Sequence, residues 1–411
     1  WMTRGYSEID AHSANIARFF DHSRTLTHVR ARTGESFNKM YGIVHPSEQY
    51  ESVRNARISP FFARQQEQGV VYFETAGWER PQWYQSNEKL IEVYGDRVMP
   101  RSAEWDSRWW SPVINAEHLA MRDRVGLVDL TAFSIFDFGG VGVLDYIQGM
   151  VVNQMNVPVG RAVYTPLLEP QGGFKADLTI MRLAEDRFRV VTGCATGNID
   201  KKWFCDHMPE DDSVRVEELT SSLCTLGLWG PRARDVLESV TSDDVSHDGL
   251  PYGCVKEITI GVVKALAFRI SYVGELGWEI YTEMEHGLLM WDTLWEAGRP
   301  YGMLPVGMGV YGTTARLEKG YRAYGMELES EYNPVEAGLA RPKVKRDDFI
   351  GKEAYLLAHG ADPAAILCTL TLDDPTSSSG EPRYMLGKEP ILAVDGAPIV
   401  DSHGRHSYVT S

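Results

Sequence analysis

The sequence lacks the features that mark membrane-spanning, secreted and disulfide-linked proteins. Its most apolar stretch, Ile258 to Ile270, is interrupted by Lys264 and Arg269, so it falls short of the roughly 18 uninterrupted apolar residues that indicate a membrane-spanning helix. The first twenty residues carry several charges and no apolar block, so no secretory signal is recognised. The five cysteines are odd in number and form no CxxC pair, which disfavours a disulfide framework or a zinc ribbon and favours a reducing compartment.

Positive charge is also scarce. The 411 residues include 41 lysines and arginines against 57 aspartates and glutamates, which gives a net charge of −16. An acidic chain repels phosphate backbones, so we expect no nucleic-acid partner. Hydrophobic residues make up 43% and charged residues 24%, which is typical of a folded globular protein. At roughly 100–200 residues per domain, the length predicts more than one domain.

Common catalytic signatures are missing or out of context. There is no HExxH and no GxSxG motif, and we predict no metal site and no serine-hydrolase site. A literal GxGxxG occurs at Gly307–Gly312, but Pro305 would break a strand before it. We therefore interpret these glycines as allowing close packing, not dinucleotide binding. Cys194, in a loop of small residues, is interpreted as a packed thiol.

Short strands and helices alternate irregularly along the chain, and this predicts an α+β fold in preference to a doubly wound sheet. The stretch Gly77–Tyr84 is expected to be an aromatic loop held by Pro81, and residues 365–411 to be strands and turns. Helices are expected at about 25–41, 61–68, 141–150, 231–240, 286–298 and 310–320, and strands at about 70–74, 133–138, 164–168, 176–182, 188–192 and 254–272.

One predicted hairpin carries polar residues in unusual positions. A turn at Gly172–Gly173 precedes a strand in which Asp177 and Thr179 alternate, so their side chains point to the same face. Tyr164, on the preceding strand, could reach that face. An acid and a hydroxyl in an otherwise apolar strand indicate a functional site. The alternative is that Asp177 accepts local turn hydrogen bonds.

A second candidate is Glu275, which is bracketed by Gly274 and Gly277 and projects from a tight loop. A carboxylate beside open backbone can bind an amidine-like edge in a bidentate way, as in the N–C–NH2 edge of a pterin. The alternative is a solvated glutamate in a turn.

A third candidate is the basic stretch that follows. Arg316 and Glu318 could form a structural pair, and Lys319 and Arg322 could line an anionic group or simply face solvent.

Together these segments resemble the folate-binding domain of the aminomethyltransferase (glycine cleavage T-protein) family. The closest branch is the C-terminal half of FAD-dependent dimethylglycine and sarcosine dehydrogenases and oxidases. Each segment alone is a weak signal, but five in the family's order, over about residues 110–345, are specific. The segments are Val125–Leu130, Gly172–Asp177, Gly230–Arg234, Ser271–Trp278 and Arg316–Leu339.

The resemblance also implies a domain organisation. Residues 1–57 are similar to the tail of the FAD oxidoreductase central region, residues 58–345 to the tetrahydrofolate-binding aminomethyltransferase domain, and residues 346–411 to a truncated C-terminal β-barrel domain. Because the chain starts at Trp1 and ends on a strand-like segment, we expect a fragment whose flavin-binding half lies upstream. FAD is expected there and not in this chain.

The implied fold is a cloverleaf of three subdomains around a central hole that holds tetrahydrofolate. By the same resemblance Asp177 is the catalytic carboxylate, Tyr164 lies close to it, Thr179 contacts the folate, and Glu275 holds the pterin edge. Where the family pattern has an arginine for the folate tail, this chain has Gly312.

Three basic residues could replace that missing tail contact. They are Arg316, Lys319 and Arg322.

The function implied is transfer of a one-carbon unit from an oxidised N-methyl group to tetrahydrofolate, giving 5,10-methylenetetrahydrofolate. The alternatives are a flavin-independent S- or O-demethylase that uses tetrahydrofolate, and a non-catalytic folate-binding module. The implied partners are folate and a small N-methyl amine or amino acid, with no nucleic acid and no membrane, and a homo-oligomer is compatible with the resemblance. The implied compartment is the cytoplasm in a bacterium and the mitochondrial matrix in a eukaryote.

Overall fold

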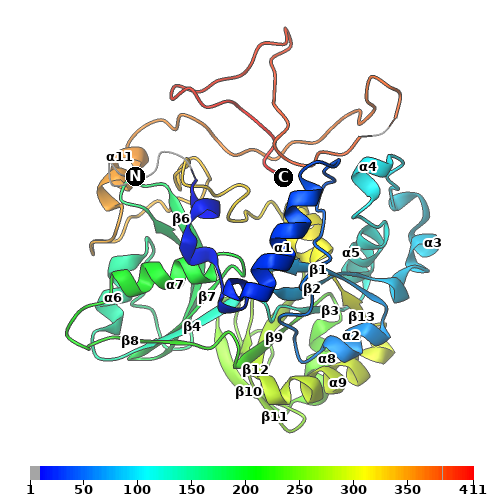
Figure 1. Cartoon of the computed structure of the whole chain (residues 1–411). Coiled ribbons are helices and arrows are strands. Elements are labelled where there is room, and N and C mark those ends of the chain that lie inside the picture. The colour runs from blue at the N-terminus through cyan, green and yellow to red at the C-terminus, as the bar shows by residue number, and fades with distance from the viewer. Residues whose placement is uncertain (1–9, 382) are drawn as a thin grey trace.

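The computed structural model describes residues 10–381 and 383–411, arranged as in Figure 1. A π-helix at Val310–Ala315 leads directly into α10. The α-helices are α1 (Leu26–Lys39), α2 (Phe62–Glu67), α3 (Leu90–Tyr94), α4 (Glu104–Ser107), α5 (Val113–Asp123), α6 (Val143–Met150), α7 (Gly197–Asp206), α8 (Ala233–Val240), α9 (Gly287–Gly298), α10 (Arg316–Lys319) and α11 (Lys352–His359). The strands are β1 (Val70–Thr75), β2 (Trp78–Tyr84), β3 (Gly126–Asp129), β4 (Ser134–Gly139), β5 (Ala162–Leu168), β6 (Phe174–Ala184), β7 (Arg187–Thr192), β8 (Arg215–Glu218), β9 (Leu223–Trp229), β10 (Val255–Ile260), β11 (Val263–Phe268), β12 (Gly277–Glu283) and β13 (Leu304–Val306).

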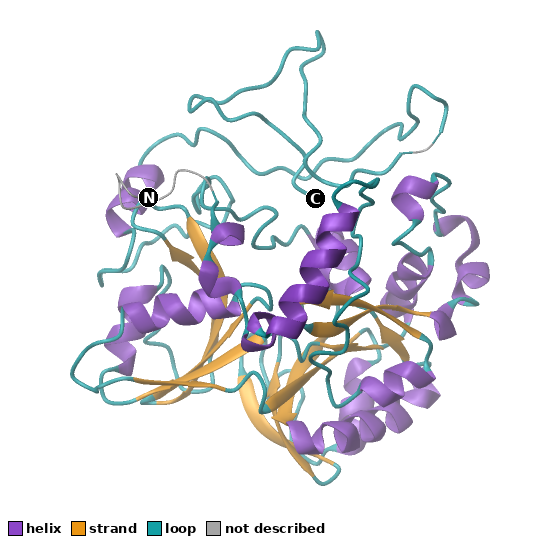
Figure 2. Cartoon of the chain, viewed as in Figure 1, coloured by secondary structure: helices purple, strands orange, loops and turns teal. Residues whose placement is uncertain are grey.

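These strands form a hairpin and two larger sheets (Figure 2). The hairpin is β1–β2. The six-stranded sheet has the order β10-β11-β12-β9-β3-β13, and the five-stranded sheet has the order β5-β6-β7-β4-β8. The β13–β3 pairing is parallel, whereas the neighbouring β3–β9 and β12–β9 pairings are antiparallel. The α+β class predicted from the sequence is confirmed.

Each large sheet is covered by helices on one face and turns its other face toward the other sheet. Trp278 and Ile280 of β12 pack with Trp291 of α9, and in the five-stranded sheet Phe138 packs with Phe204 of α7. A further cluster draws residues from both sheets, and we call this junction the two-sheet interface. Its buried residues are Ile135, Ala162, Met181, Val191, Val255, Phe268 and Tyr281.

Two segments that contain proline are strands, against the sequence-based expectation. The expected loop at Gly77–Tyr84 contains β2, in which Pro81 pairs with Tyr72 across a two-stranded sheet. The strand judged to be broken by Pro305 is β13, at the edge of the six-stranded sheet. Proline lacks a backbone N–H and is tolerated where a strand has a free edge. The expectation was wrong because the sequence does not say which strands lie at an edge.

The glycines after β13 pack closely, as expected from the sequence. A Cβ atom on Gly307 would lie 2.1 Å from the carbonyl oxygen of Gln82, and one on Gly309 would lie 3.0 Å from the same atom. The absence of a side chain at Gly307 and Gly309 therefore lets the backbone of β2 approach closely. This confirms that the literal GxGxxG serves packing.

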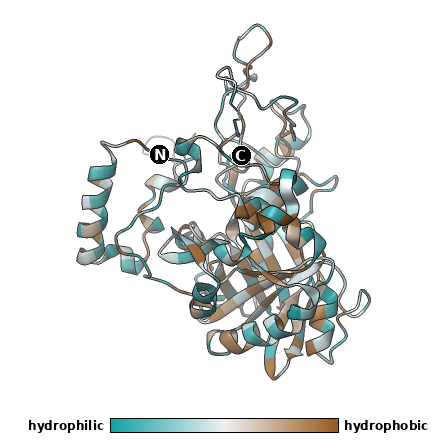
Figure 3. Cartoon of the chain, turned by 90° about the vertical axis from the view of Figure 1, so that its right-hand side faces the viewer, coloured by the Kyte–Doolittle hydropathy of each residue, from teal (hydrophilic) through white to brown (hydrophobic). Residues whose placement is uncertain are grey.

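The N-terminal part of the chain forms an exposed helix, whereas the C-terminal part consists of loops. The expected N-terminal helix is present as α1, none of whose residues is buried, and it stands at the left edge in Figure 3. After α11 the chain runs as long loops across the top of Figures 1 and 2. Pairing there consists of isolated bridges such as Pro390–Tyr408 and Val400–His406. The β-barrel predicted for residues 346–411 stays a prediction.

Across the described residues 10–381 and 383–411, no helix combines the length and the apolar character required to cross a bilayer.

Candidate functional site

The polar hairpin singled out in the sequence forms as expected. Strands β5 and β6 are antiparallel neighbours, and Tyr164 lies directly opposite Thr179. Gly172, with a φ of 86°, allows the turn between them. Directly opposite residues, and residues two apart on one strand, share a face of a sheet. Tyr164, Asp177 and Thr179 therefore project together from the five-stranded sheet, on the face that looks into the two-sheet interface.

Asp177 is the chemically distinctive member of this group. The Tyr164 hydroxyl donates a hydrogen bond to Asp177 Oδ2 at 2.9 Å. Burial raises the pKa of Asp177 to about 6, and the nearby charge of Asp200 pushes in the same direction, while the Tyr164 hydrogen bond opposes the rise. A carboxyl with a pKa near neutrality can both accept and return a proton under physiological conditions. Such a group in a partly open position is a candidate for acid–base work.

The opposite sheet presents a second carboxyl to the same interface. Glu279 of β12 pairs with Phe268 of β11, whose side chain belongs to the two-sheet interface. The Tyr281 hydroxyl donates to Glu279 Oε2 at 2.5 Å. Burial raises the pKa of Glu279 to about 7, and the Tyr281 hydrogen bond partly opposes that rise. The sequence analysis did not single out Glu279. Because it lies two residues before Tyr281 on β12, the two side chains share the face that looks into the two-sheet interface.

Tyrosine rings pack together within electrostatic reach of both carboxyls. The rings of Tyr272 and Tyr311 have centroids 5.0 Å apart. After burial, the charges of Glu279 and Asp177 are among the causes that raise the pKa of the Tyr311 hydroxyl, so this residue lies within electrostatic reach of both. Tyr321 stacks on Tyr272 at 5.8 Å. Flat rings next to hydrogen-bond acceptors are suited to a flat heterocycle that carries N–H groups.

Comparison with known proteins agrees with this geometry. Residues 61–345 match the family described as GCVT N-terminal domain. The chain belongs to this family. Residues 4–59 match a second family, described as FAD dependent oxidoreductase central domain. The resemblance inferred from the five sequence segments is thereby confirmed.

Two curated relatives match this chain over most of its length. The chain is 30% identical over 378 residues to 4-methylaminobutanoate oxidase (formaldehyde-forming) of Paenarthrobacter nicotinovorans, covering 91% of the chain and 44% of the relative. It is 30% identical over 399 residues to the mitochondrial dimethylglycine dehydrogenase of Homo sapiens, covering 94% of the chain and 44% of the relative. The chain thus spans less than half the length of these curated relatives.

A solved structure shows the same fold. The crystal structure of glycine cleavage system aminomethyltransferase T from Bartonella henselae superposes with a TM-score of 0.64 at 21% identity, covering 87% of this chain and 85% of that one. The likeness supports the predicted T-protein-like fold.

Glu275, in contrast, is engaged in a different cluster. Arg122 donates to Glu275 Oε1 at 2.6 Å and to Glu318 at 2.9 Å. The loop before β12 holds Glu275 beside α5 and α10, because Gly274 lies against the side chains of Arg122 and Lys319. Its carboxylate is therefore already paired with a guanidinium. The role of Glu275 at a pterin edge stays a prediction, and Glu279 is a second candidate for it.

The basic residues of the third segment also separate. Arg316 is fully buried and pairs with Glu327 at 2.7 Å, so the suggested Arg316–Glu318 pair is not formed and Arg316 is unavailable to a ligand. Arg322 donates to the backbone carbonyls of Ala337 and Gly320. Its charge lowers the pKa of Tyr164, against the dominant effect of burial, which raises it. The charge of Arg322 therefore acts on Tyr164.

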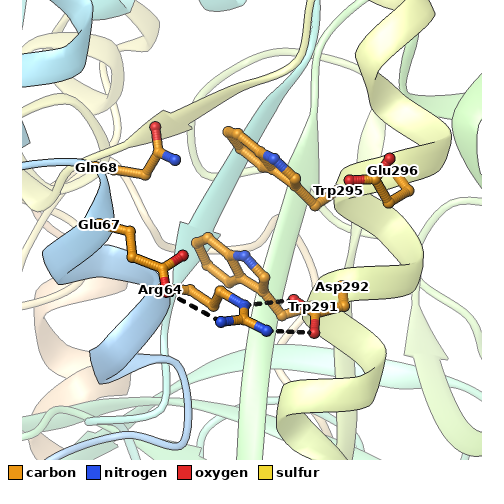
Figure 4. Close-up of a pocket in the computed structure, with 7 residues that line it drawn as sticks. All are labelled: Arg64, Glu67, Gln68, Trp291, Asp292, Trp295 and Glu296. Carbon is orange, nitrogen blue, oxygen red and sulfur yellow. Dashed lines mark hydrogen bonds and ion pairs between the residues drawn. The ribbon is translucent and has the colours of Figure 1, made fainter.

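A surface pocket lies on the other side of the six-stranded sheet (Figure 4). It has a volume of about 370 Å³ and lies between α2 and α9, and Arg64 and Asp292 close part of it by an ion pair at 2.8 Å. Trp291, which lines it, belongs to the core that packs α9 on the outer face of that sheet. This pocket is therefore separate from the two-sheet interface.

Proposed function

We propose that this chain is the tetrahydrofolate-binding half of a flavin-dependent N-demethylating enzyme of the dimethylglycine or sarcosine type. In this proposal it transfers the one-carbon unit of an oxidised N-methyl group to tetrahydrofolate, giving 5,10-methylenetetrahydrofolate. The observation that carries the proposal is the Tyr164–Asp177 pair, on the sheet face that looks into the two-sheet interface, in a chain that also matches the oxidoreductase central domain.

Residues at and near the two-sheet interface have the chemistry that a reduced folate needs. A pterin is flat and has an N–C–NH2 edge, so it needs an aromatic surface and a carboxylate acceptor. Tyr272 and Tyr311 supply rings 5.0 Å apart, and Glu279 or Glu275 supplies the acceptor. In this proposal Thr179, which lies opposite Tyr164 in the five-stranded sheet, contacts the ligand. FAD has no proposed site in this chain.

Asp177 is the proposed catalytic residue. Tetrahydrofolate supplies two amine nitrogens that capture a carbon at the oxidation level of formaldehyde. In its ionised form the Asp177 carboxylate accepts a proton released as a carbon–nitrogen bond forms, and it stabilises the positive charge of an iminium carbon. The Tyr164 hydroxyl orients that carboxylate through its hydrogen bond.

A binding experiment tests the proposal most directly. We expect the chain to bind tetrahydrofolate with micromolar or tighter affinity in a calorimetric titration under anaerobic conditions. Glu285→Gln is the control for loss of a glutamate charge away from the site. Glu285 is an exposed acid in the 3-10 turn before α9, so this variant should bind tetrahydrofolate as the wild type does. If neither calorimetry nor equilibrium dialysis detects binding, the proposed function is wrong.

The raised pKa of Asp177 predicts the pH dependence of transfer. Because the ionised form accepts the proton, kcat/KM for one-carbon transfer should rise as the pH increases through about 6, the pKa of Asp177. Tyr164→Phe removes the hydrogen bond that holds this pKa down, so the midpoint should move to higher pH. A pH–rate profile of both proteins checks this, and an identical midpoint in the variant would separate Asp177 from the titration.

A further inference from the structure

Helix α1 is attached to the rest of the chain through its polar side chains. Arg32 pairs with Glu74 of β1 at 3.3 Å, and Lys39 donates to Glu48 at 2.9 Å. The Glu35 carboxylate accepts two backbone N–H groups from the segment that follows the helix. Because Arg32, Glu35 and Lys39 follow one another at intervals of three and four residues, they lie on one face of the helix, which we call the inner face.

The other side of α1 carries large apolar side chains that are exposed. They belong to Leu26, Val29 and Phe37 and to Met40 at the C-terminal end of the helix, and they are between 44% and 69% exposed. Intervals of three, eight and three residues place the four on one stripe, about 130° around the helix from the inner face. We call these four residues the α1 stripe. Figure 3 shows α1 at the edge of the molecule, with no other element beyond it.

This orientation is the reverse of that in most surface helices. An amphipathic helix normally packs its apolar face on the protein core and leaves its charged face in water. In α1 the charged inner face makes the contacts and the α1 stripe meets solvent. Exposed apolar side chains continue past the helix, where Tyr41, Ile43 and Val44 are between 67% and 75% exposed. An exposed apolar surface of this extent indicates a site of protein interaction.

The stretch that contains α1 has no apolar core of its own. Among the described residues 10–59 no hydrophobic side chain is buried, and the first buried hydrophobic residue after them is Phe61. Residues 4–59 nevertheless match the family described as FAD dependent oxidoreductase central domain. A globular domain is stable because it buries apolar surface. The remainder of such an oxidoreductase is therefore the cover that fits these side chains.

We propose that the α1 stripe is the docking surface for the FAD-dependent oxidoreductase module of the same enzyme. This inference rests on the proposed function, in which such a module oxidises the N-methyl group. The matched region makes up 44% of the oxidase of Paenarthrobacter nicotinovorans, so more than half of that relative is available to form the module. A second copy of this chain is the competing occupant, and the experiment distinguishes the two.

The experiment compares this chain alone with a full-length chimera, in which the chain replaces the matched region of that oxidase. The visible absorbance of bound FAD shows that the oxidoreductase part of the chimera is folded. Hydrogen–deuterium exchange of the backbone amides of residues 26–40 is measured in both proteins by mass spectrometry. We expect these amides to exchange at least about tenfold more slowly in the chimera, because docking on the α1 stripe opposes local opening of the helix.

A variant of the stripe and a matched control separate docking from other causes of slow exchange. Val29→Gln combined with Phe37→Gln makes the stripe polar and keeps a good helix former at both positions. The control combines Val141→Gln and Val262→Gln, which replace valines that are 95% and 82% exposed in turns away from α1. We expect the stripe variant to abolish the slow exchange and to lower the Tm of the chimera but not that of the chain alone. The control should change neither protein.

Equal exchange rates in the chain and the chimera, or slow exchange that persists in the stripe variant, would overturn the inference. Sedimentation velocity of the chain alone tests the competing occupant. A dimer that the stripe variant dissociates would assign the stripe to a second copy and also overturn the inference. If the chimera does not retain FAD, the chain is mixed with the flavoprotein part of the oxidase supplied separately, and unchanged exchange there counts against docking. The proposed function fails separately, if the chain does not bind tetrahydrofolate.

Discussion

Replacement of Asp177 by asparagine is expected to slow one-carbon transfer to tetrahydrofolate by about 10²- to 10⁴-fold, the usual contribution of a positioned acid–base group. Asparagine keeps the shape of the side chain and can still accept the hydrogen bond from Tyr164, but it cannot take up a proton at neutral pH. Folate affinity should therefore change far less than the rate. Single-turnover measurement of product formation, together with a calorimetric titration, separates the two quantities.

A suitable control for this variant is Asp206→Asn. Asp206 is an exposed residue at the end of α7 that pairs with Lys202, so its substitution should leave both the rate and the affinity unchanged. If Asp177→Asn transfers the one-carbon unit at the wild-type rate, the catalytic assignment is wrong. The remaining candidate on the facing sheet would then be Glu279, whose pKa burial raises to about 7.

Replacement of Glu279 by glutamine is expected to weaken tetrahydrofolate binding by roughly 10- to 100-fold, the cost of losing a hydrogen bond to a charged group in a desolvated site. Glu279 faces the two-sheet interface next to Tyr281, and its charge reaches Tyr311. Glutamine retains the size of the side chain, so the loss would reflect the carboxylate itself. Calorimetric titration measures the change.

Glu275→Gln is the informative comparison, because the resemblance to the family assigned the pterin edge to Glu275. In this structure its carboxylate accepts from Arg122, and we expect its substitution to weaken folate binding less than that of Glu279. If Glu275→Gln weakens folate binding more than Glu279→Gln does, Glu275 in the loop before β12 is the residue that binds the pterin edge. It would leave Glu279 as a buried acid that is held by Tyr281 for structural reasons.

The hairpin that carries Tyr164, Asp177 and Thr179 was readable from the sequence because its signals are local. A Gly-Gly turn fixes where two strands reverse, and the two-residue period of a strand fixes which side chains share a face. These two rules place the side chains of Asp177 and Thr179 on one face of the sheet, and they place Tyr164 on the same face of the neighbouring strand. The class of the fold and the helix at 286–298, present as α9, were likewise set by periodic patterns within single elements.

The errors have a common cause in long-range packing. Pro81 and Pro305 lie in strands because those strands lie at free edges, and an edge is defined by the whole sheet. Arg316 pairs with Glu327 instead of its neighbour Glu318 because the chain folds back on the end of α10. The local pattern was compatible with a loop or an edge strand at each proline. It was likewise compatible with Glu318 or a more distant acid as the partner of Arg316.

The sequence by itself thus determined the family, through five segments in a fixed order, and the α+β class, through the order of its elements. It also determined the face on which Asp177, Thr179 and Tyr164 lie, because that depends on residues close together in the chain. The tertiary structure decided which carboxyl of the second sheet faces the two-sheet interface. Glu275 is taken by Arg122, 153 residues away, and Glu279 instead reaches the interface. Pairings across such separations depend on how two sheets pack together, and no period or turn signal within one segment encodes that packing.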